Sequence, residues 1–122
     1  MFLRLLILLA LFGYSSAALA ATLNVSPATG VYGSGSTFTV RVAVDTKGAA
    51  INAADGTITF DNKALQVVSV SRSSSIFNLW TTEPGFSNSA GTINFSGGTP
   101  TGYTGGSGTV MTITFRTLGS GS

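Results

Sequence analysis

The sequence contains no cysteine and no histidine, and charged residues are scarce, with six basic and four acidic side chains among 122 residues. Without cysteine there is no disulfide framework, no thiolate zinc site and no thiol nucleophile. Without histidine the chain lacks the commonest general base and the commonest metal ligand. The formal net charge of +2 is too small to provide the basic patch that binds nucleic acid. These absences argue against an enzyme and against a nucleic-acid-binding protein.

The four acidic residues are the remaining candidates for catalysis, as a glycosidase pair, or for a calcium site built from carboxylate and carbonyl oxygens. Asp45 and Asp61 stand at predicted strand ends before turns, where aspartate commonly accepts local backbone hydrogen bonds. Glu83 falls in a predicted loop, and Asp55 is the fourth acid. No acid belongs to a recognisable catalytic or metal-binding motif. We therefore expect no enzyme, no metal site and no cofactor; two of these carboxylates about 5–9 Å apart in a cleft would contradict that expectation.

The N-terminus has the three parts of a secretory signal peptide. Arg4 supplies a positive charge, residues 5–12 form an unbroken apolar run, and Ala18-Leu19-Ala20 is a small-x-small cleavage site. The run is shorter than the roughly 20 residues that a membrane-spanning helix needs. We expect residues 1–20 to be a bacterial Sec-type signal peptide that is removed on export. Membrane contact is then transient, and the protein is secreted or displayed at the cell surface.

The rest of the chain has the alternating pattern of antiparallel β-strands. The pattern is clearest at residues 37–45, where Phe38, Val40, Val42 and Val44 share one face. Strands are predicted at residues 23–26, 37–45, 56–60, 65–72, 86–89, 92–96 and 108–118.

Glycine and proline clusters predict the turns between these strands. Residues 74–80 form the single predicted helical turn, and residues 101–107 form a predicted glycine-rich loop. Several short strands joined by such turns indicate an all-β sandwich or barrel. The predicted turns are at residues 27–30, 33–36, 84–85 and 97–100.

Two aromatic residues, Trp80 and Tyr103, fall in or beside predicted loops. Exposed aromatic rings at such positions stack on the faces of sugars, which makes a polysaccharide one candidate ligand. Large aromatic side chains also dominate small cores, so Phe77, Leu79 and Trp80 are also candidates for a plug at the open end of a sandwich. The sequence leaves both alternatives open.

Several segments resemble the cohesin domain when their order and spacing are taken together. Residues 51–56 (Ile-Asn-Ala-Ala-Asp-Gly) precede residues 58–61 (Ile-Thr-Phe-Asp) and residues 65–70 (Leu-Gln-Val-Val-Ser-Val). In cohesin domains a strand that ends in an aromatic–Asp pair leads through a turn into a strand containing Leu-x-Val. Residues 91–95 (Gly-Thr-Ile-Asn-Phe) and residues 108–115 resemble later strands of the family. The resemblance covers about residues 22–118.

The resemblance implies a jelly-roll β-sandwich of eight to nine antiparallel strands at residues 21–118, from a superfamily related to carbohydrate-binding modules. Cohesin domains bind dockerin modules, often on polysaccharide-degrading enzymes, through one sheet face. The chain is therefore expected to be a non-catalytic module that docks a dockerin-like partner. The alternatives are a module that binds polysaccharide directly and a structural domain of a surface or adhesive protein.

The resemblance also implies partner-binding residues. The Asn-x-Asp motif of the family corresponds here to Ala53-Ala54-Asp55, with Asn52 one position before the expected asparagine. The residues implied are Asn52, Asp55, Thr57 and Thr59. The last strand of the family has no counterpart after Leu118, and we expect residues 119–122 (Gly-Ser-Gly-Ser) to be a flexible tail or the start of a linker.

Overall fold

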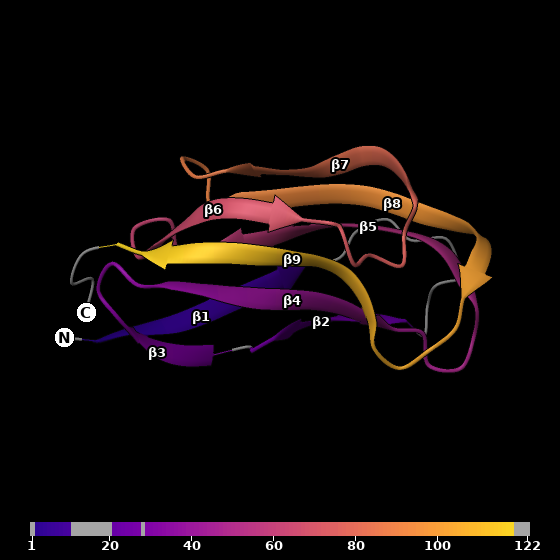
Figure 1. The fold of residues 1–122 in the computed structure, drawn as a ribbon, viewed down its shortest axis with the longest axis horizontal. Coiled ribbons are helices and arrows are strands. Elements are labelled where there is room, and N and C mark those ends of the chain that lie inside the picture. Colours follow the sequence, from indigo (N-terminus) through magenta and orange to yellow (C-terminus); the bar gives the residue numbers. More distant parts are fainter. Residues whose placement is uncertain (1, 11–20, 28, 119–122) are drawn as a thin grey trace.

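The computed structural model describes residues 2–10, 21–27 and 29–118, and all regular elements in this part of the chain are β-strands (Figure 1). One sheet has five strands in the order β3-β1-β5-β8-β7, and the other has four in the order β2-β4-β9-β6. All neighbouring strands pair antiparallel, which confirms the predicted all-β sandwich. The strands are β1 (Phe2–Ala10), β2 (Thr22–Ser26), β3 (Thr29–Gly33), β4 (Thr37–Asp45), β5 (Ile51–Phe60), β6 (Leu65–Ser71), β7 (Leu79–Ser87), β8 (Thr92–Tyr103) and β9 (Gly108–Thr117).

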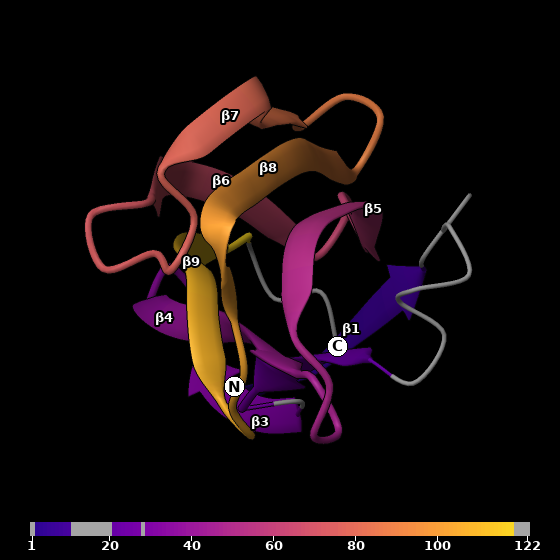
Figure 2. The same ribbon diagram turned by 90° about the vertical axis from the view of Figure 1, so that its right-hand side faces the viewer.

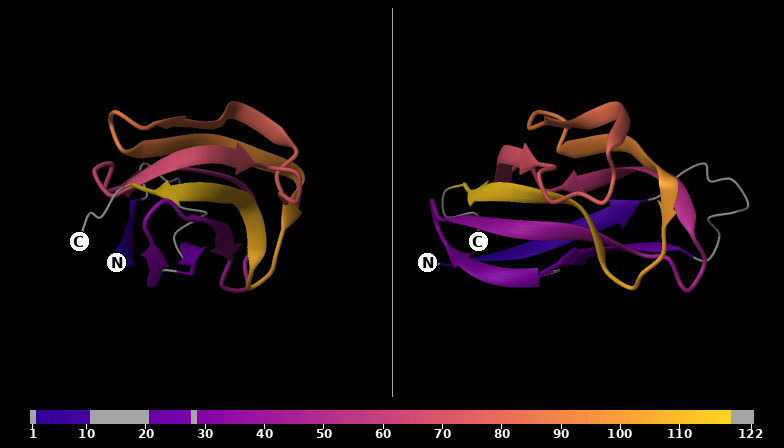
Figure 3. Two further views of the ribbon diagram at one scale, coloured as in Figure 1. Left: turned by 60° about the vertical axis from the view of Figure 1, so that its left-hand side comes forward. Right: turned by 45° about the vertical axis from the view of Figure 1, so that its right-hand side comes forward.

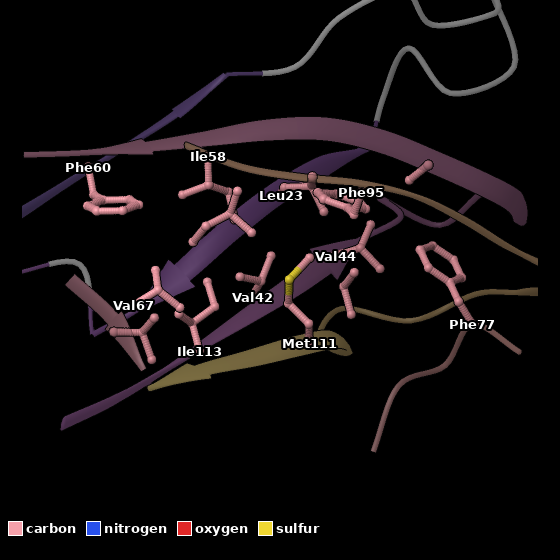
Figure 4. Packing of buried hydrophobic residues seen from close by; sticks show 14 of the residues in the cluster. Leu23, Val42, Val44, Ile58, Phe60, Val67, Phe77, Phe95, Met111 and Ile113 are labelled. Carbon is pink, nitrogen blue, oxygen red and sulfur yellow. The ribbon is translucent and has the colours of Figure 1, made fainter. Parts of the chain in front are cut away.

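The core fills the space between the two sheets, which Figures 2 and 3 show as separate layers. Alternation along β5 and β8 directs every second side chain inward, as expected for antiparallel sheets with one solvated face. In Figure 4, Ile58 and Phe60 of β5 point toward Val42 of β4 and Ile113 of β9. Ile58, Val42 and Ile113 are fully buried. The core also contains Val40, Val44, Leu65, Val67, Ile93, Phe95, Val110, Met111 and Phe115.

An aromatic ladder closes one end of this core. Tyr32 stacks on Phe38 with ring centroids 4.1 Å apart, and Phe38 stacks on Phe115 at 5.6 Å. Phe60 meets Phe115 edge-on at 5.4 Å. Because such pairs add about 0.5–1.5 kcal/mol to the burial of their area, the ladder joins the two sheets firmly at this end.

Two register shifts explain where side chains depart from strict alternation between the core and the solvent. The sequence places Val110 on the face opposite Met111, but a bulge opposite Val42 and Ala43 leaves both Val110 and Met111 buried. A second shift between Val67 and Ser69 leaves two consecutive residues, Val68 and Ser69, exposed, and Val70 packs against the core. A β-bulge adds one residue to a strand and so reverses the facing of the residues that follow it.

One predicted helical turn and two predicted turns between strands do not occur where they were expected. Residues 74–80 contain no helical turn, because residues 74–78 are irregular and β7 begins at Leu79. Residues 84–85 lie inside β7 and residues 97–100 lie inside β8. Proline is compatible with β7 because β7 is an edge strand, where one side of the backbone needs no ladder partner. The predicted loop at residues 101–107 is shorter, since residues 101–103 still belong to β8.

The side chain of Asn88 connects the two sheets at the bulge of β6. Its Oδ1 accepts a hydrogen bond from the Val67 N–H at 2.7 Å, and its Nδ2 donates to the Val67 carbonyl at 3.1 Å. The Asn88 side chain therefore supplies the two hydrogen bonds that a neighbouring strand would otherwise give to the backbone of buried Val67.

Asn88→Ala is expected to lower the free energy of unfolding by about 1–3 kcal/mol, because it leaves both backbone groups of Val67 without their partner. Urea denaturation measures the change. The matched control is Asn62→Ala, which removes a single exposed hydrogen bond from Asn62 Nδ2 to the Ser89 carbonyl. Equal effects of the two substitutions would contradict the role assigned to Asn88.

The N-terminal segment has a defined place in this sandwich. β1 pairs with β3 on one side, from Phe2–Gly33 to Leu6–Thr29, and with β5 on the other, from Ile7–Phe60 to Ala10–Thr57. The predicted cleavage site at residues 18–20 and the predicted tail at residues 119–122 lie outside the described residues. Across the described ranges, no helix is long and apolar enough to cross a membrane.

Candidate functional site

The exposed side of β5, β8 and β7, here named the β5–β8–β7 face, carries small polar side chains in rows across three paired strands. Asp55 lies opposite Ser96, which lies opposite Thr82. One row further along β5, Thr57 lies opposite Asn94. Directly opposed residues of antiparallel strands point to the same side of the sheet. The topology therefore gathers hydroxyl, amide and carboxylate groups from three separate segments of the chain.

Hydrogen bonds fix several of these side chains. Thr57 Oγ1 donates to Asn94 Oδ1 at 2.7 Å, and Thr81 Oγ1 donates to Ser96 Oγ at 2.8 Å. A shallow pocket opens between the strands. Its lining consists of Asp55, Gly56, Thr57, Thr82, Asn94, Phe95 and Ser96.

One apolar side chain borders this polar area. Leu79 lies opposite Gly98, which lies opposite Ala53, and Leu79 is 58% exposed. The predicted plug is therefore wrong for Leu79, although Phe77 is buried as that alternative required. The β5–β8–β7 face thus combines polar rows with an apolar residue at one end.

The structure brings three of the four implied partner-binding residues onto this face: Asp55, Thr57 and Thr59 alternate along β5 with buried Gly56 and Ile58. Asn52 is also exposed, because a register shift between Ile51 and Ala53 leaves two consecutive residues facing solvent. Its Nδ2 donates to the carbonyls of Thr99 at 3.5 Å and Pro100 at 3.3 Å. Asn52 thereby supports the stretch of β8 that the shift leaves without ladder partners.

Trp80 packs against the core from β7. Its indole meets the ring of Phe77 edge-on with centroids 5.8 Å apart, and it covers Gly97 of β8. A methyl group at Gly97 would lie 2.7 Å from indole carbon Cε3, so the glycine is required by this close approach. The Arg72 guanidinium carbon lies over the Trp80 ring, 6.0 Å from its centroid. Packing thus accounts for the half-buried position of Trp80.

Tyr103 is also half-buried and packs against the core cluster. Its ring covers the backbone of Gly108, where an added methyl group would lie 2.6 Å from Cε2. Trp80 lies opposite Gly97, whereas Tyr103 lies opposite Ile51 beyond the register shift. The two predicted sugar-stacking rings therefore come from different strands and pack on different glycines.

Local partners engage Asp45, Asp61 and Glu83. Asp45 Oδ1 accepts the Lys47 N–H at 2.9 Å, and Asp61 Oδ1 accepts the Lys63 N–H at 3.0 Å, which confirms the predicted turn role of both. Glu83 forms an ion pair with Arg72 at 3.0 Å. Among the described residues, no group of three or more acidic side chains is placed to hold a metal ion.

The turn at Asp45 makes a small pH-dependent contribution to stability. The hydrogen bond from the Lys47 backbone, with that from its side chain, lowers the pKa of Asp45 below its ordinary value of 3.8. A lowered pKa means that the contribution is present above the ordinary value and is lost as the pH falls through the folded-state value. In Asp45→Asn, which removes the charge, stability is expected to fall less steeply on acidification. Thermal unfolding of both chains across the acid range tests this, and parallel curves would contradict it.

The exposed side of the four-stranded sheet has a different character. Arg41 of β4 is bound to the start of β9 and to the residue before it: Nε donates to Thr109 Oγ1 at 2.6 Å, and a terminal nitrogen donates to the Ser107 carbonyl at 2.7 Å. Arg116 of β9 is exposed on the same side, where Thr39 lies opposite Thr114. This side is basic, whereas the β5–β8–β7 face contains the carboxylate of Asp55. The two outer surfaces of the sandwich are therefore distinct.

Comparison with known proteins identifies the fold and the family. A family model for the cohesin domain matches residues 21–122. The chain belongs to the cohesin domain family. Cohesin domains are non-catalytic binding modules whose partners are dockerin modules. No curated protein and no solved structure gave a match.

Sequence reasoning missed the half of this cohesin's candidate site that β8 and β7 supply. Asn94 and Ser96 alternate with buried Ile93 and Phe95, so their exposure was predictable. Their position beside Asp55 and Thr57 was not, because it depends on the pairing of β5 with β8, strands that lie about 40 residues apart in sequence.

Proposed function

We propose that this cohesin domain binds a dockerin-like protein module through the β5–β8–β7 face. The observation that carries the proposal is the pair of opposed rows, Asp55–Ser96–Thr82 and Thr57–Asn94, on a rigid sheet in a chain of a dockerin-binding family. Rigid strands hold such groups at fixed spacing, which lowers the entropy lost on association. The face is also free of long flexible side chains along these rows.

The chemistry of the face describes the complementary partner surface. The Asp55 carboxylate accepts hydrogen bonds, and the hydroxyl and amide groups around it both donate and accept. A matching surface presents a basic or hydrogen-bond-donating side chain near Asp55 and an apolar side chain near Leu79. Charged groups at an interface determine specificity and association rate more than affinity, so the choice among dockerins is expected to depend on Asp55.

The setting of this function is part of the same proposal. Arg4, the apolar run at residues 5–12 and the Ala18-x-Ala20 site support export by signal peptide, which would place the cohesin outside the cell or at its surface. There it would join enzymes that degrade polysaccharides, through the dockerin modules that those enzymes carry. In this proposal the cohesin contributes attachment and the partner contributes catalysis.

Isothermal titration with a panel of purified dockerin modules tests the proposal. Saturable 1:1 binding to at least one dockerin is expected, together with no retention on insoluble cellulose or xylan. Retention on a polysaccharide without binding to any dockerin from the same genome would overturn the proposal in favour of direct carbohydrate binding. Absence of both would favour a structural role in a larger surface protein.

A further inference from the structure

The outer surface of the four-stranded sheet, here named the β2–β4–β9–β6 face, carries polar side chains in three rows. The strands β6, β9, β4 and β2 lie side by side in that sheet (Figure 1). Directly paired residues of antiparallel strands project to the same side, so the register defines each row. None of the side chains in these rows is buried, so together they form one accessible surface. The rows are Ser26–Arg41–Thr112–Ser71, Thr39–Thr114–Ser69 and Thr37–Arg116–Gln66.

The charge in these rows is entirely positive. It comes from Arg41 and Arg116, while the four acidic residues of the chain lie outside the rows. A surface that presents cations without neighbouring carboxylates attracts a negatively charged partner. The acidic residues are Asp45, which is paired with Lys47 at 3.2 Å, Asp55 on the β5–β8–β7 face, Asp61 in the turn after β5, and Glu83 on β7.

Arg41 is held in one position by the start of β9. Its three guanidinium nitrogens donate to Thr109 Oγ1 at 2.6 Å, to Ser107 Oγ at 2.9 Å and to the Ser107 carbonyl at 2.7 Å. A guanidinium carries five N–H donors, so these three bonds to described residues fix the group and leave donors for a ligand. A cation that is already ordered loses less side-chain entropy when it binds an anion.

The two cations are held apart along the sheet. Arg41 pairs with Thr112, which lies four residues before Arg116 on β9, or about 13 Å along the strand at 3.3 Å per residue. Thr109 and Ser107 lie still further from Arg116, so the bonds to them direct the Arg41 guanidinium away from Arg116. A single carboxylate therefore contacts one of the two cations, whereas an extended polymer with repeated negative charges contacts both.

Hydroxyl groups occupy the surface between the two arginines. Thr39 lies opposite Thr114 in the middle row, and Ser69 completes that row. Threonine is β-branched and has few rotamers, so its hydroxyl forms hydrogen bonds at low entropic cost. Hydroxyl groups both donate and accept, as the hydroxyl groups of a sugar do. The rows contain no aromatic residue, so this surface is suited to hydrogen bonding and charge pairing rather than to stacking on sugar rings.

We propose that the β2–β4–β9–β6 face binds an extended polysaccharide that carries carboxylate groups, such as a polyuronate. Arg41 and Arg116 each pair with a carboxylate, and the hydroxyl groups between them bind the intervening sugars. Duplex nucleic acid carries one negative charge per about 1.7 Å, too dense for a surface with two cations to neutralise. The proposal does not rest on dockerin binding, because it uses the other sheet. The two outer surfaces of the sandwich face opposite directions, so both partners can be bound together.

Binding of the full chain to immobilised polygalacturonate, measured by biolayer interferometry, tests the class of ligand. Saturable binding that weakens as sodium chloride is added is expected, because salt screens exposed charges. Fully methyl-esterified polygalacturonate has the same sugars without the charges and is expected not to bind. Monomeric galacturonic acid is expected not to compete at equal carboxylate concentration. No binding of the charged polymer, equal binding of the ester, or full competition by the monomer would overturn the proposal.

Two substitutions that add the same charge locate the binding surface. Thr39→Glu places a carboxylate between Arg41 and Arg116 and is expected to weaken polygalacturonate binding at least about 10-fold by repelling the polymer. Ala53→Glu adds the same side chain at an exposed position of the other sheet, and is expected to change binding less than about 2-fold because salt screens distant charges. An equal loss in both variants would mean that net charge alone drives binding, which contradicts a site on this face.

Two substitutions that remove the same charge complete the test. Arg116→Gln is expected to weaken polygalacturonate binding at least about 5-fold, since it removes one of the two carboxylate partners. The matched control is Arg72→Gln, because the Arg72 side chain points to Glu83 and Trp80 of the other sheet. It is expected to leave binding unchanged, and equal effects of the two would contradict the proposal. Urea denaturation checks that each variant is folded.

Discussion

Thr57→Arg is expected to weaken dockerin binding by at least about 30-fold, which corresponds to about 2 kcal/mol. Thr57 lies at the centre of the β5–β8–β7 face, hydrogen-bonded to Asn94 and one row from Asp55. A long cationic side chain there would separate a docked partner from the sheet. It would also bring a positive charge close to the basic group expected opposite Asp55. Isothermal titration of the variant against the best dockerin of the panel measures the change.

Two controls make the result interpretable. Thr39→Arg introduces the same side chain at an exposed threonine of the other sheet and is expected to leave binding unchanged. Asp55→Asn preserves the shape of the face while removing its charge, and is expected to reduce affinity mainly through slower association. If Thr39→Arg weakened binding as strongly as Thr57→Arg, the partner would not be docking on the β5–β8–β7 face.

Trp80→Ala is expected to lower the free energy of unfolding by about 3 kcal/mol, the lower end of the range for truncating buried aromatic residues. The indole packs edge-on against buried Phe77 and covers Gly97, so its removal leaves a cavity against β8. Urea denaturation measures the loss. A ring that serves mainly to stack on sugars would show the opposite pattern, with lost polysaccharide retention and nearly unchanged stability. That result would favour direct carbohydrate binding over dockerin binding.

The strand pattern was readable from the sequence wherever alternation was undisturbed. The alternation of residues 37–45 predicted β4 with its bounds, because Val40 and Val42 are buried while Thr39 and Arg41, before and between them, are not. Prediction failed where glycine and proline lie inside strands. Gly97 resembles a turn residue in sequence, but it belongs to β8 because the Trp80 ring needs the space of a side chain. Such a packing reason is tertiary and has no local signal.

The candidate site was half predictable for a related reason. Asp55, Thr57 and Thr59 follow from one strand and from the resemblance to the cohesin family. Their partners Asn94 and Ser96 depend on a long-range pairing, whose register no local pattern specifies. Likewise, the apolar run at the N-terminus reads as a signal peptide by composition. Nothing in its sequence indicates that residues 2–10 pair with both β3 and β5.

The central claim is that the β5–β8–β7 face is the docking surface, and chemical-shift mapping by NMR tests it most directly. A chain of 122 residues is small enough for assigned amide spectra, which can be followed during titration with an unlabelled dockerin. The largest shifts are expected to cluster at Asp55, Thr57, Asn94 and Ser96. Shifts clustered instead on the other sheet, at Thr39, Arg41, Thr114 and Arg116, would contradict it.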